Sequence, residues 1–134
     1  MDDPKLTILE LIKGGWGLTV SSTFSADWVQ EKASFPQVVV SHLLTNPRPT
    51  GFSENPATVD RRMEGIYRVE VWSKTATERW ALLGEVDRIL KSKCNDPGGA
   101  LESLTVSSWV DVDYGTTRPT LYRSRVRVEV LYYG

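Results

Sequence analysis

The stretch from residue 59 to residue 90 limits most strongly what this chain can fold into, because a strand, a helix cap and a long amphipathic helix follow one another directly. Residues 66–72 alternate between the two faces of an extended chain and are rich in strand-forming side chains. One face of this strand would present Tyr67, Val69 and Val71, and the other would present Ile66, Arg68, Glu70 and Trp72.

A helix start signal stands directly after this strand, at the capping-box sequence Thr75-Ala76-Thr77-Glu78. In such a box the threonine hydroxyl accepts an amide hydrogen bond, while the glutamate reaches back to the cap residue. A helix over residues 76–93 would run about 27 Å at about 1.5 Å per residue. Its apolar stripe would consist of Trp80, Leu83, Val86, Ile89 and Leu90. A helix of this length needs a sheet face to pack against.

The N-terminal third predicts a short helix and a strand. Asp3 and Pro4 fit a cap and a first helical position, and Gly14-Gly15 would end that helix. Its apolar stripe would consist of Leu6, Leu9 and Ile12. Residues 16–34 leave two possibilities open, a short strand near 16–22 and an irregular piece or helical turn at 25–32. Residues 37–44 then predict a strand buried on both faces, with apolar side chains at Val38, Val39, Val40, Leu43 and Leu44.

Residues 45–62 predict a long loop, because Pro47, Pro49, Gly51 and Pro56 lie within them. Loops of this length inside a compact domain are usually functional or mobile.

The last third predicts a β-hairpin, with strands near 104–113 and 122–132 joined by residues 114–120. If Val112 pairs with Tyr122, Asp111 lies opposite Arg123 and Trp109 lies opposite Arg125. This register would give an ion pair and a cation–π contact on one face.

The predicted fold class is therefore α+β, with an antiparallel sheet of four to five strands. The helix over residues 76–93 packs on its valine face, and a short helix stands at the N-terminus. With 134 residues, the chain is expected to form a single domain, 1–134.

Composition narrows the function classes. Apolar residues make up 40% and charged residues 25%, as in a globular protein. The net charge of −1 gives no global attraction to DNA or to an anionic membrane. One cysteine, Cys94, excludes an internal disulfide framework and a cysteine zinc site, and it fits a reducing compartment. No apolar run approaches a membrane span of about 18 residues, and Met1-Asp2-Asp3 is acidic where a signal peptide would be basic.

Catalysis finds little support in the sequence. His42 is the only histidine and lies in the valine-rich strand, where a structural role is favoured. Cys94 has no neighbour that would lower its pKa. Asp111 and Asp113 resemble a carboxylate pair but are expected to be salt-bridged surface residues. We therefore expect no enzyme, no cofactor and no metal.

The strand face that carries Arg123, Arg125 and Arg127 has two interpretations, a phosphate-tracking row or a solvated sheet face. The same face is predicted to present the apolar side chains Ile66, Trp72, Trp109, Leu131 and Tyr133. A monomer rarely exposes so many together, and aromatic residues and arginine are the usual anchors of protein interfaces. The pattern therefore favours an interface with another chain.

At this point the chain resembles the tail-terminator or tail-completion (head–tail joining) proteins of long-tailed phages and proviruses. The resemblance covers most of the chain and rests on its size and on the N-terminal helix. It also rests on Phe35-Pro36-Gln37-Val38-Val39-Val40, on the proline-bearing loop before Gly65-Ile66-Tyr67-Arg68-Val69-Glu70-Val71-Trp72, on the helix over residues 78–92, and on the terminal hairpin that ends at Tyr133.

The resemblance implies a non-enzymatic subunit of a virion tail, assembled in the host cytoplasm. Such proteins form rings, commonly hexameric, at the end of the tail tube, where they stop tube growth and join the tail to the neck or head. The implied partners are other copies, the tail tube protein and the neck protein, with DNA passing through the ring and no membrane. The alternative is a stand-alone α+β binding module for a small ligand or peptide.

Loop 45–62 and turn 113–120 are the expected contacts with the tube or a neighbouring copy. The candidate interface residues are Arg48, Phe52, Arg61, Arg62, Trp72, Trp109, Arg118, Arg123, Arg125 and Tyr133.

Overall fold

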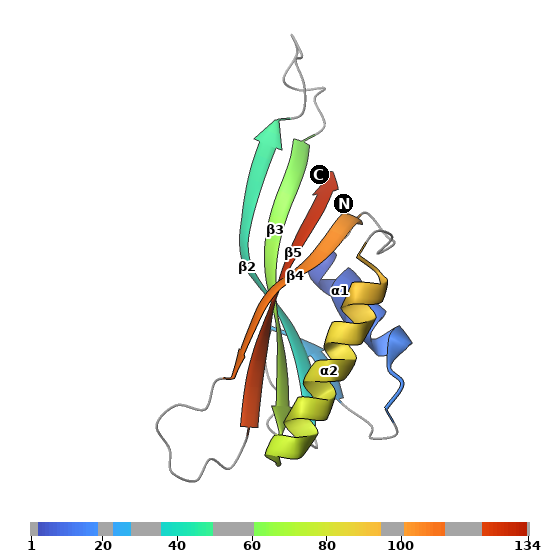
Figure 1. Cartoon of the computed structure of the whole chain (residues 1–134). Helices are drawn as coiled ribbons and strands as arrows, with labels where there is room; N and C mark the ends of the chain where they lie inside the picture. The colour runs from blue at the N-terminus through green and yellow to red at the C-terminus, as the bar shows by residue number, and fades with distance from the viewer. Residues whose placement is uncertain are drawn as a thin grey trace.

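One twisted sheet with helices on a single face forms the frame of the molecule (Figure 1). The computed structural model describes residues 3–18, 23–27, 36–49, 61–94, 101–111 and 122–133. In chain order these residues form α1 (Pro4–Gly15), β1 (Thr23–Ala26), β2 (Gln37–Pro49), β3 (Arg61–Ser73), α2 (Ala76–Ser92), β4 (Leu101–Asp111) and β5 (Tyr122–Tyr133). The predicted α+β class is confirmed, and the sheet has five strands, within the predicted four to five.

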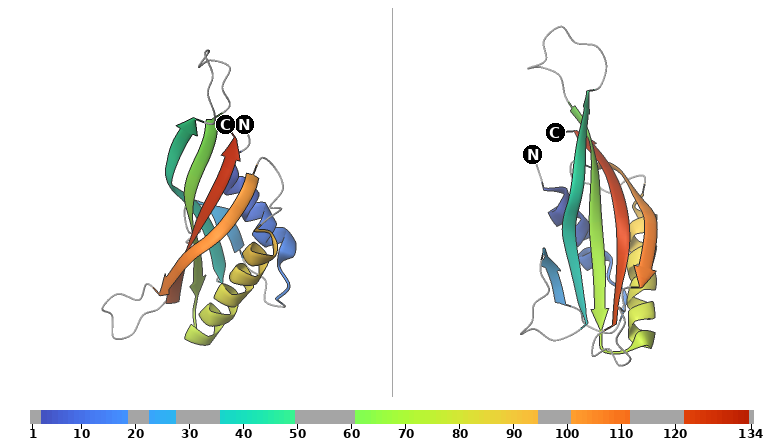
Figure 2. Two further views of the ribbon diagram at one scale, coloured as in Figure 1. Left: turned by 45° about the horizontal axis from the view of Figure 1, so that its top comes forward. Right: turned by 90° about the vertical axis from the view of Figure 1, so that its left-hand side faces the viewer.

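The strands lie in the order β1-β2-β3-β5-β4. β1 pairs with β2 in parallel, and the other neighbours are antiparallel, so the sheet is mixed where an antiparallel one was predicted. Figure 2 shows α1 and α2 side by side against the same face of the sheet. The core between helices and sheet contains Ile8 and Ile12 of α1, the apolar side of α2, and the alternate strand residues Val38, Val40, Tyr67, Val69, Val71, Val126, Val128 and Val130.

The predicted cap of α2 is present, with one more hydroxyl in it than expected. The Thr75 hydroxyl accepts a hydrogen bond of 3.1 Å from the Glu78 amide. The Glu78 carboxylate does not reach the cap amide itself but accepts from the Ser73 hydroxyl at 2.7 Å. That hydroxyl in turn accepts from the Thr75 amide at 3.2 Å, so Ser73 relays the closure of the capping box.

The buried side of α2 is rotated from the predicted stripe. Leu83, Val86, Ile89 and Leu90 are buried as expected, but Leu82 joins them and Trp80 is 66% exposed. Trp80 was expected in the core because its spacing fits the stripe. The sheet covers α2 around Leu82 and Leu83, and Trp80 lies beyond its rim against Trp109.

Helix α1 is capped by Asp3, whose side chain accepts from the Lys5 amide at 3.0 Å. Ile8 and Ile12 are fully buried, whereas Leu6, which was predicted to be buried, is 51% exposed. The end of α1 is held against α2: the Arg88 guanidinium donates to the Gly15 carbonyl at 2.9 Å. A Cβ on Gly15 would lie 3.1 Å from Ile89, so the close contact favours glycine where the helix ends.

The predicted loop over residues 45–62 is shorter than expected, because β2 runs to Pro49 and β3 begins at Arg61. Among the described strands, β1 pairs with β2 only along Gln37–Val40, so no described strand lies on that side of β2 at Pro47 and Pro49, where proline is tolerated. Along β2, Val38, Val39 and Val40 are buried as predicted, but Leu43 and Leu44 are about half exposed at a register irregularity. The described residues form a strand at 23–26, and residues 16–18 are not in a strand. Residues 19–22 and 28–35, on which the rest of these predictions falls, lie outside the described residues.

A bulge changes the predicted hairpin register. Leu104 lies opposite Val130 and Val106 opposite Val128, which is the expected register. An irregularity between Val106 and Ser108 then inserts one residue, so Asp111 lies opposite Ser124 and Trp109 opposite Val126. The predicted Asp111–Arg123 and Trp109–Arg125 pairs are therefore wrong, because Trp109 and Asp111 turn to the helix side. Val112 and Asp113 lie outside the described residues.

Candidate assembly interface

The side of the sheet turned away from α1 and α2, here called the open face, collects the side chains that alternate with the core. Register places on it Trp72, Glu70, Arg68, Ile66 and Glu64 from β3, and Arg123, Arg125, Arg127, Glu129 and Leu131 from β5. β2 adds Leu44 and Asn46, together with Gln37, Val39 and Ser41, which are buried. β4 adds Ser103, Thr105, Ser108 and Val110. Charged and aromatic residues thus gather on a surface that the helices do not cover.

Glu70 is the centre of one half of this face, the basic half, which consists of Arg68, Glu70, Trp72, Arg123, Arg125 and Arg127. The Glu70 side chain is only 9% exposed. Its carboxylate lies 2.9 Å from Nε of Arg68 and 3.6 Å from Nε of Arg123. A buried carboxylate needs such partners, because desolvation of an unpaired charge is costly. Glu70 therefore fixes the arginines that lie around it.

Among the described residues, three buried donor atoms of the basic half have no acceptor with hydrogen-bond geometry: Nε of Arg68, Nε1 of Trp72 and Nε of Arg125. Of these, Nε of Arg68 still lies at ion-pair distance from Glu70. A buried donor left without an acceptor costs about 1–3 kcal/mol. The Arg123 guanidinium lies over the Trp72 ring, 4.7 Å from the ring centroid, and the two form a cation–π pair. This half of the face is rich in hydrogen-bond donors.

The other half of the open face is a hollow of about 250 Å³, here called the acidic hollow. Ile66 and Leu131 are half buried in its lining, and the glutamates Glu64 and Glu129 stand among them. The remaining lining residues are Asn46, Gly65, Ser103, Thr105 and Val130. The hollow spans β2, β3, β5 and β4 and offers an apolar base with carboxylates and hydroxyls around it.

The ten sequence-predicted interface residues separate into four groups. Trp72, Arg123 and Arg125 meet on the open face, although Arg125 lies opposite Glu70 and not opposite Trp109. Trp109 does not join them: it is 48% exposed on the helix side, with its ring centroid 5.7 Å from that of Trp80.

The backbones of Arg48, Arg61, Arg62 and Tyr133 lie together where the strands β2, β3 and β5 meet, since Arg62 pairs with both Arg48 and Tyr133. Phe52 and Arg118 lie outside the described residues. Glu64 and Glu129 were not predicted as interface residues. For Glu129, the change from arginine to glutamate along β5 was a possible signal.

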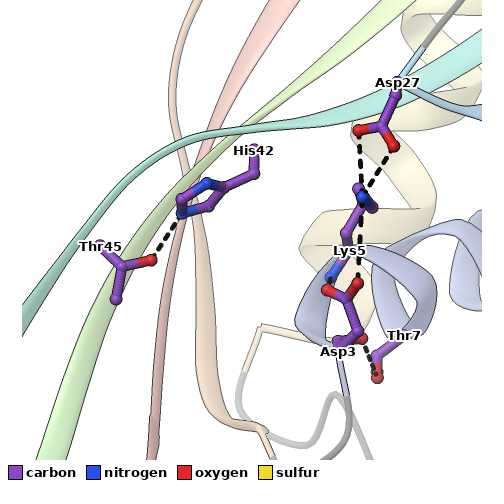
Figure 3. A network of polar contacts seen from close by, with 6 residues as sticks. All are labelled: Asp3, Lys5, Thr7, Asp27, His42 and Thr45. Carbon is purple, nitrogen blue, oxygen red and sulfur yellow. Dashed lines mark hydrogen bonds and ion pairs between the residues drawn. The ribbon is translucent and has the colours of Figure 1, made fainter.

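His42 does not lie in a buried strand segment, as the sequence predicted, but is exposed on the helix side of β2 (Figure 3). Its Nε2 lies 2.6 Å from the Thr45 hydroxyl oxygen, and its ring lies 5.1 Å from the Tyr67 ring. Lys5, at the start of α1, donates to both carboxylate oxygens of Asp27, at 3.0 and 2.9 Å. Asp27 has a positive φ of 71° and ends β1, so this ion pair joins α1 to the sheet edge.

The ionisable groups near His42, the Lys5 ammonium group and the Tyr67 phenol, have structural roles. The hydrogen bond to Asp27 raises the pKa of Lys5 above its usual 10.5, which keeps the ammonium group charged. Burial raises the pKa of the Tyr67 hydroxyl, with further contributions from Tyr132, so that the phenol stays protonated. A protonated phenol and a protonated, ion-paired ammonium group are poorly suited to act as a general base.

Within the part of the chain that the structure describes, histidine, cysteine, aspartate and glutamate residues form no cluster that could hold a metal ion. None of the helices described is long and apolar enough to cross a membrane.

Comparisons with known proteins agree with the resemblance noted in the sequence. No family model and no curated protein matches the chain. Among solved structures, a chain from the virion of a native gene transfer agent particle is similar, with 10% sequence identity and a TM-score of 0.50 over 95% of this chain and 84% of that chain. A sheath/tube terminator of an extracellular contractile injection system, in its extended state, matches 94% of this chain with 10% identity and a TM-score of 0.55.

The match covers 54% of that terminator, so this chain corresponds to about half of its length. At 10% identity these likenesses establish the fold. The chain has the same fold as a component of a gene transfer agent particle and as a sheath/tube terminator, which is consistent with a tail-terminator protein.

Proposed function

We propose that the chain is a structural subunit of a virion tail, which forms a ring at the end of the tail tube, terminates tube growth and joins the tail to the neck or head. The observation that carries this proposal is the fold match to a sheath/tube terminator over 94% of the chain. The second match, to a chain of a gene transfer agent virion, covers nearly the same residues. Both proteins belong to particles that are built from many protein subunits.

The division of the sheet into two unlike faces supports an assembly role. α1 and α2 pack against one face of the sheet, and this face forms the hydrophobic core. The open face holds arginines and a tryptophan, which are residue types enriched in protein interfaces. The mechanism would be geometric, because complementary surfaces repeated around a closed cyclic symmetry limit the number of copies.

The partners in this proposal are other copies of the chain in a hexamer, the tail tube protein and the neck or head-completion protein. Residues 1–134 would act as one domain, without a cofactor and without catalysis. DNA would pass through the ring without sequence-specific binding, and the net charge of −1 fits a lumen that does not hold it tightly. The protein would be part of the virion tail after assembly in the host cytoplasm.

Electron microscopy of particles made without this protein tests the proposal. We expect tubes of uncontrolled length and heads without tails, and complementation by the full chain should restore joined particles of uniform length. Normal tails in the absence of the protein would refute the proposal.

The acidic hollow favours a second candidate, a stand-alone module that binds a small ligand or peptide on its sheet. Light scattering during size-exclusion chromatography separates the two, because a module would remain a monomer at every concentration whereas a ring subunit would associate.

A further inference from the structure

Arg125, near the middle of β5, is a cation that the fold leaves without an ionic partner. Among the described residues, no carboxylate forms an ion pair with it, and its buried Nε atom has no acceptor. Glu70 lies directly opposite in the β3–β5 register, but that carboxylate is engaged by Arg68 and Arg123. The terminal nitrogen atoms of Arg125 are not among the buried donors, so the end of its guanidinium group is accessible to solvent.

Arg127 adds a second cation on the same strand and the same face. Its side chain is 50% exposed, and its contact with Glu129, at 3.8 Å, is a weak surface pair. In the β3–β5 register it lies opposite Arg68, and like charges in directly opposite positions destabilise a sheet. Arg125 and Arg127 are two residues apart, about 7 Å along a strand, so one carboxylate between them can contact both guanidinium groups.

The accessible part of the open face at this position lies over β5 and β4. The β2 side is covered, because three residues there are buried: Gln37, Val39 and Ser41. On the β4 side, Val110 lies opposite Arg125 and is 59% exposed, and Ser108 lies opposite Arg127 and is exposed as well. The two arginines therefore stand beside an apolar side chain on accessible surface.

Cations beside apolar surface match a carboxylate of a protein better than the phosphates of a nucleic acid. A guanidinium group binds a carboxylate through charged hydrogen bonds, and its methylene stem can cover an apolar neighbour of the acid. Glu70 and Glu129 stand on the same face and would repel a row of phosphates. Arginine next to apolar side chains is also typical of the centre of protein interfaces.

We propose that Arg125 and Arg127 bind a carboxylate side chain of a partner protein, with Val110 packing against the residue next to that acid. The proposal rests on the proposed function only in that the partner would be another protein of the tail. The buried Nε atom holds the guanidinium group of Arg125 in place before binding, which lowers the entropy cost of the contact.

NMR titration of the full chain with a defined peptide tests the proposal. The probe is a blocked peptide in which glutamate alternates with alanine, and the matched control peptide has glutamine in place of each glutamate. We expect only the glutamate peptide to shift the Arg125 Nε–H signal, which is identified by its absence from the Arg125→Gln variant.

Affinity is measured at the Val110 amide signal, which every variant retains. Arg125→Gln should weaken binding of the glutamate peptide at least about ten-fold, because the site would lose a hydrogen bond between charged groups. Lys13→Gln makes the same change in charge at an exposed position of α1 and should bind as the wild type does. If circular dichroism shows that Arg125→Gln does not fold, Arg125→Lys replaces it. Lysine keeps the charge but loses the planar fork, so binding should weaken several-fold.

Two carboxylates of this chain that lie outside the described residues are tested as alternative occupants. They are Glu31, in the segment before β2, and Asp113, in the segment after β4. Glu31→Gln and Asp113→Asn should leave both the Arg125 Nε–H signal and the peptide affinity unchanged. A signal that moves in either variant, or a peptide that binds either variant more tightly, overturns the proposal, because the acceptor then belongs to this chain.

The proposal is also overturned if the wild type shows no shift at peptide concentrations up to about 10 mM, or if the glutamine peptide binds equally well. Tighter binding of an oligothymidylate than of the glutamate peptide would overturn it in favour of a phosphate site. Particle assays separate the two claims: a failed titration, with tails that still depend on this protein for their length and joining, refutes the carboxylate site and leaves the proposed function standing.

Discussion

The guanidinium of Arg123 lies 4.7 Å from the centroid of the Trp72 ring, and the two residues are direct partners in the β3–β5 register. The contact holds a charged group flat against an aromatic ring, next to the buried carboxylate of Glu70. The open face therefore has a fixed arrangement of cations before any partner binds, which lowers the entropy cost of binding.

Replacing Glu70 with glutamine should destabilise the chain by about 1–3 kcal/mol, because Arg68 and Arg123 would lose the carboxylate between them. The free energy of unfolding in urea measures this loss. Glu129→Gln is the matched control, since that side chain is 49% exposed, and should change stability by less than about 0.5 kcal/mol. Equal effects at the two positions would show that Glu70 does not organise the arginines.

Replacing Gly65 with alanine should destabilise the chain by about 1–3 kcal/mol through overpacking. A Cβ at this position would lie 2.7 Å from Cε2 of Tyr67 and 3.2 Å from Val130. Gly84→Ala, on the exposed side of α2, has nothing within 4 Å of the added Cβ and should stabilise the helix by up to about 1 kcal/mol. Thermal denaturation of both variants measures the contrast, and a Gly65→Ala protein as stable as the wild type would contradict it.

The Lys5–Asp27 ion pair should contribute to stability in a pH-dependent way. Because the folded state raises the pKa of Lys5, the contribution is fully present below the ordinary pKa of 10.5 and is lost as pH rises through the raised value. Lys5→Met should therefore be less stable than the wild type by up to about 1 kcal/mol near pH 8. The difference should shrink above pH 10.5 in urea titrations. Tyr67 titrates in both proteins and cancels in the comparison, and a difference that is constant with pH would exclude this pair as its source.

Trp80→Ala should cost less than about 1 kcal/mol, whereas Leu83→Ala should cost about 2–5 kcal/mol. The two residues lie near each other on α2, but Trp80 is 66% exposed and Leu83 is 1% exposed. Chemical denaturation of each variant tests the position of the buried side of α2. A loss at Trp80 as large as that at Leu83 would support the core position that the sequence predicted.

The sequence predicted those helices and strands that are specified by a pattern of a few neighbouring residues. Alternation placed Tyr67, Val69 and Val71 in the core, and the Thr75 cap fixed the start of α2. The fold class followed from these elements. The short strand β1 was not predicted at residues 23–26, because four residues carry too little periodicity to identify a strand.

The sequence predicted the candidate interface correctly only where the paired strands have no register irregularity. Trp72, Arg123 and Arg125 came together because β3 and β5 pair without a shift. Trp109 lies on the opposite face from the predicted one, because a bulge at Ser107-Ser108 shifts the register. Two consecutive polar residues give no sequence signal for the inserted position. The acidic hollow needs side chains from four strands, so a strand order was required before Glu64 and Glu129 could be brought together.

Two strands near the sides of the sheet also limit how copies could meet. Along β2, Pro47 and Pro49 have no amide hydrogen to offer beyond the segment that pairs with β1. At the other side of the sheet, irregularities interrupt the outer strand β4. Interrupted edges of this kind oppose the strand-by-strand addition that leads to fibres. In the proposed ring, where copies would gather at high local concentration, such edges would oppose edge-to-edge pairing of sheets without end.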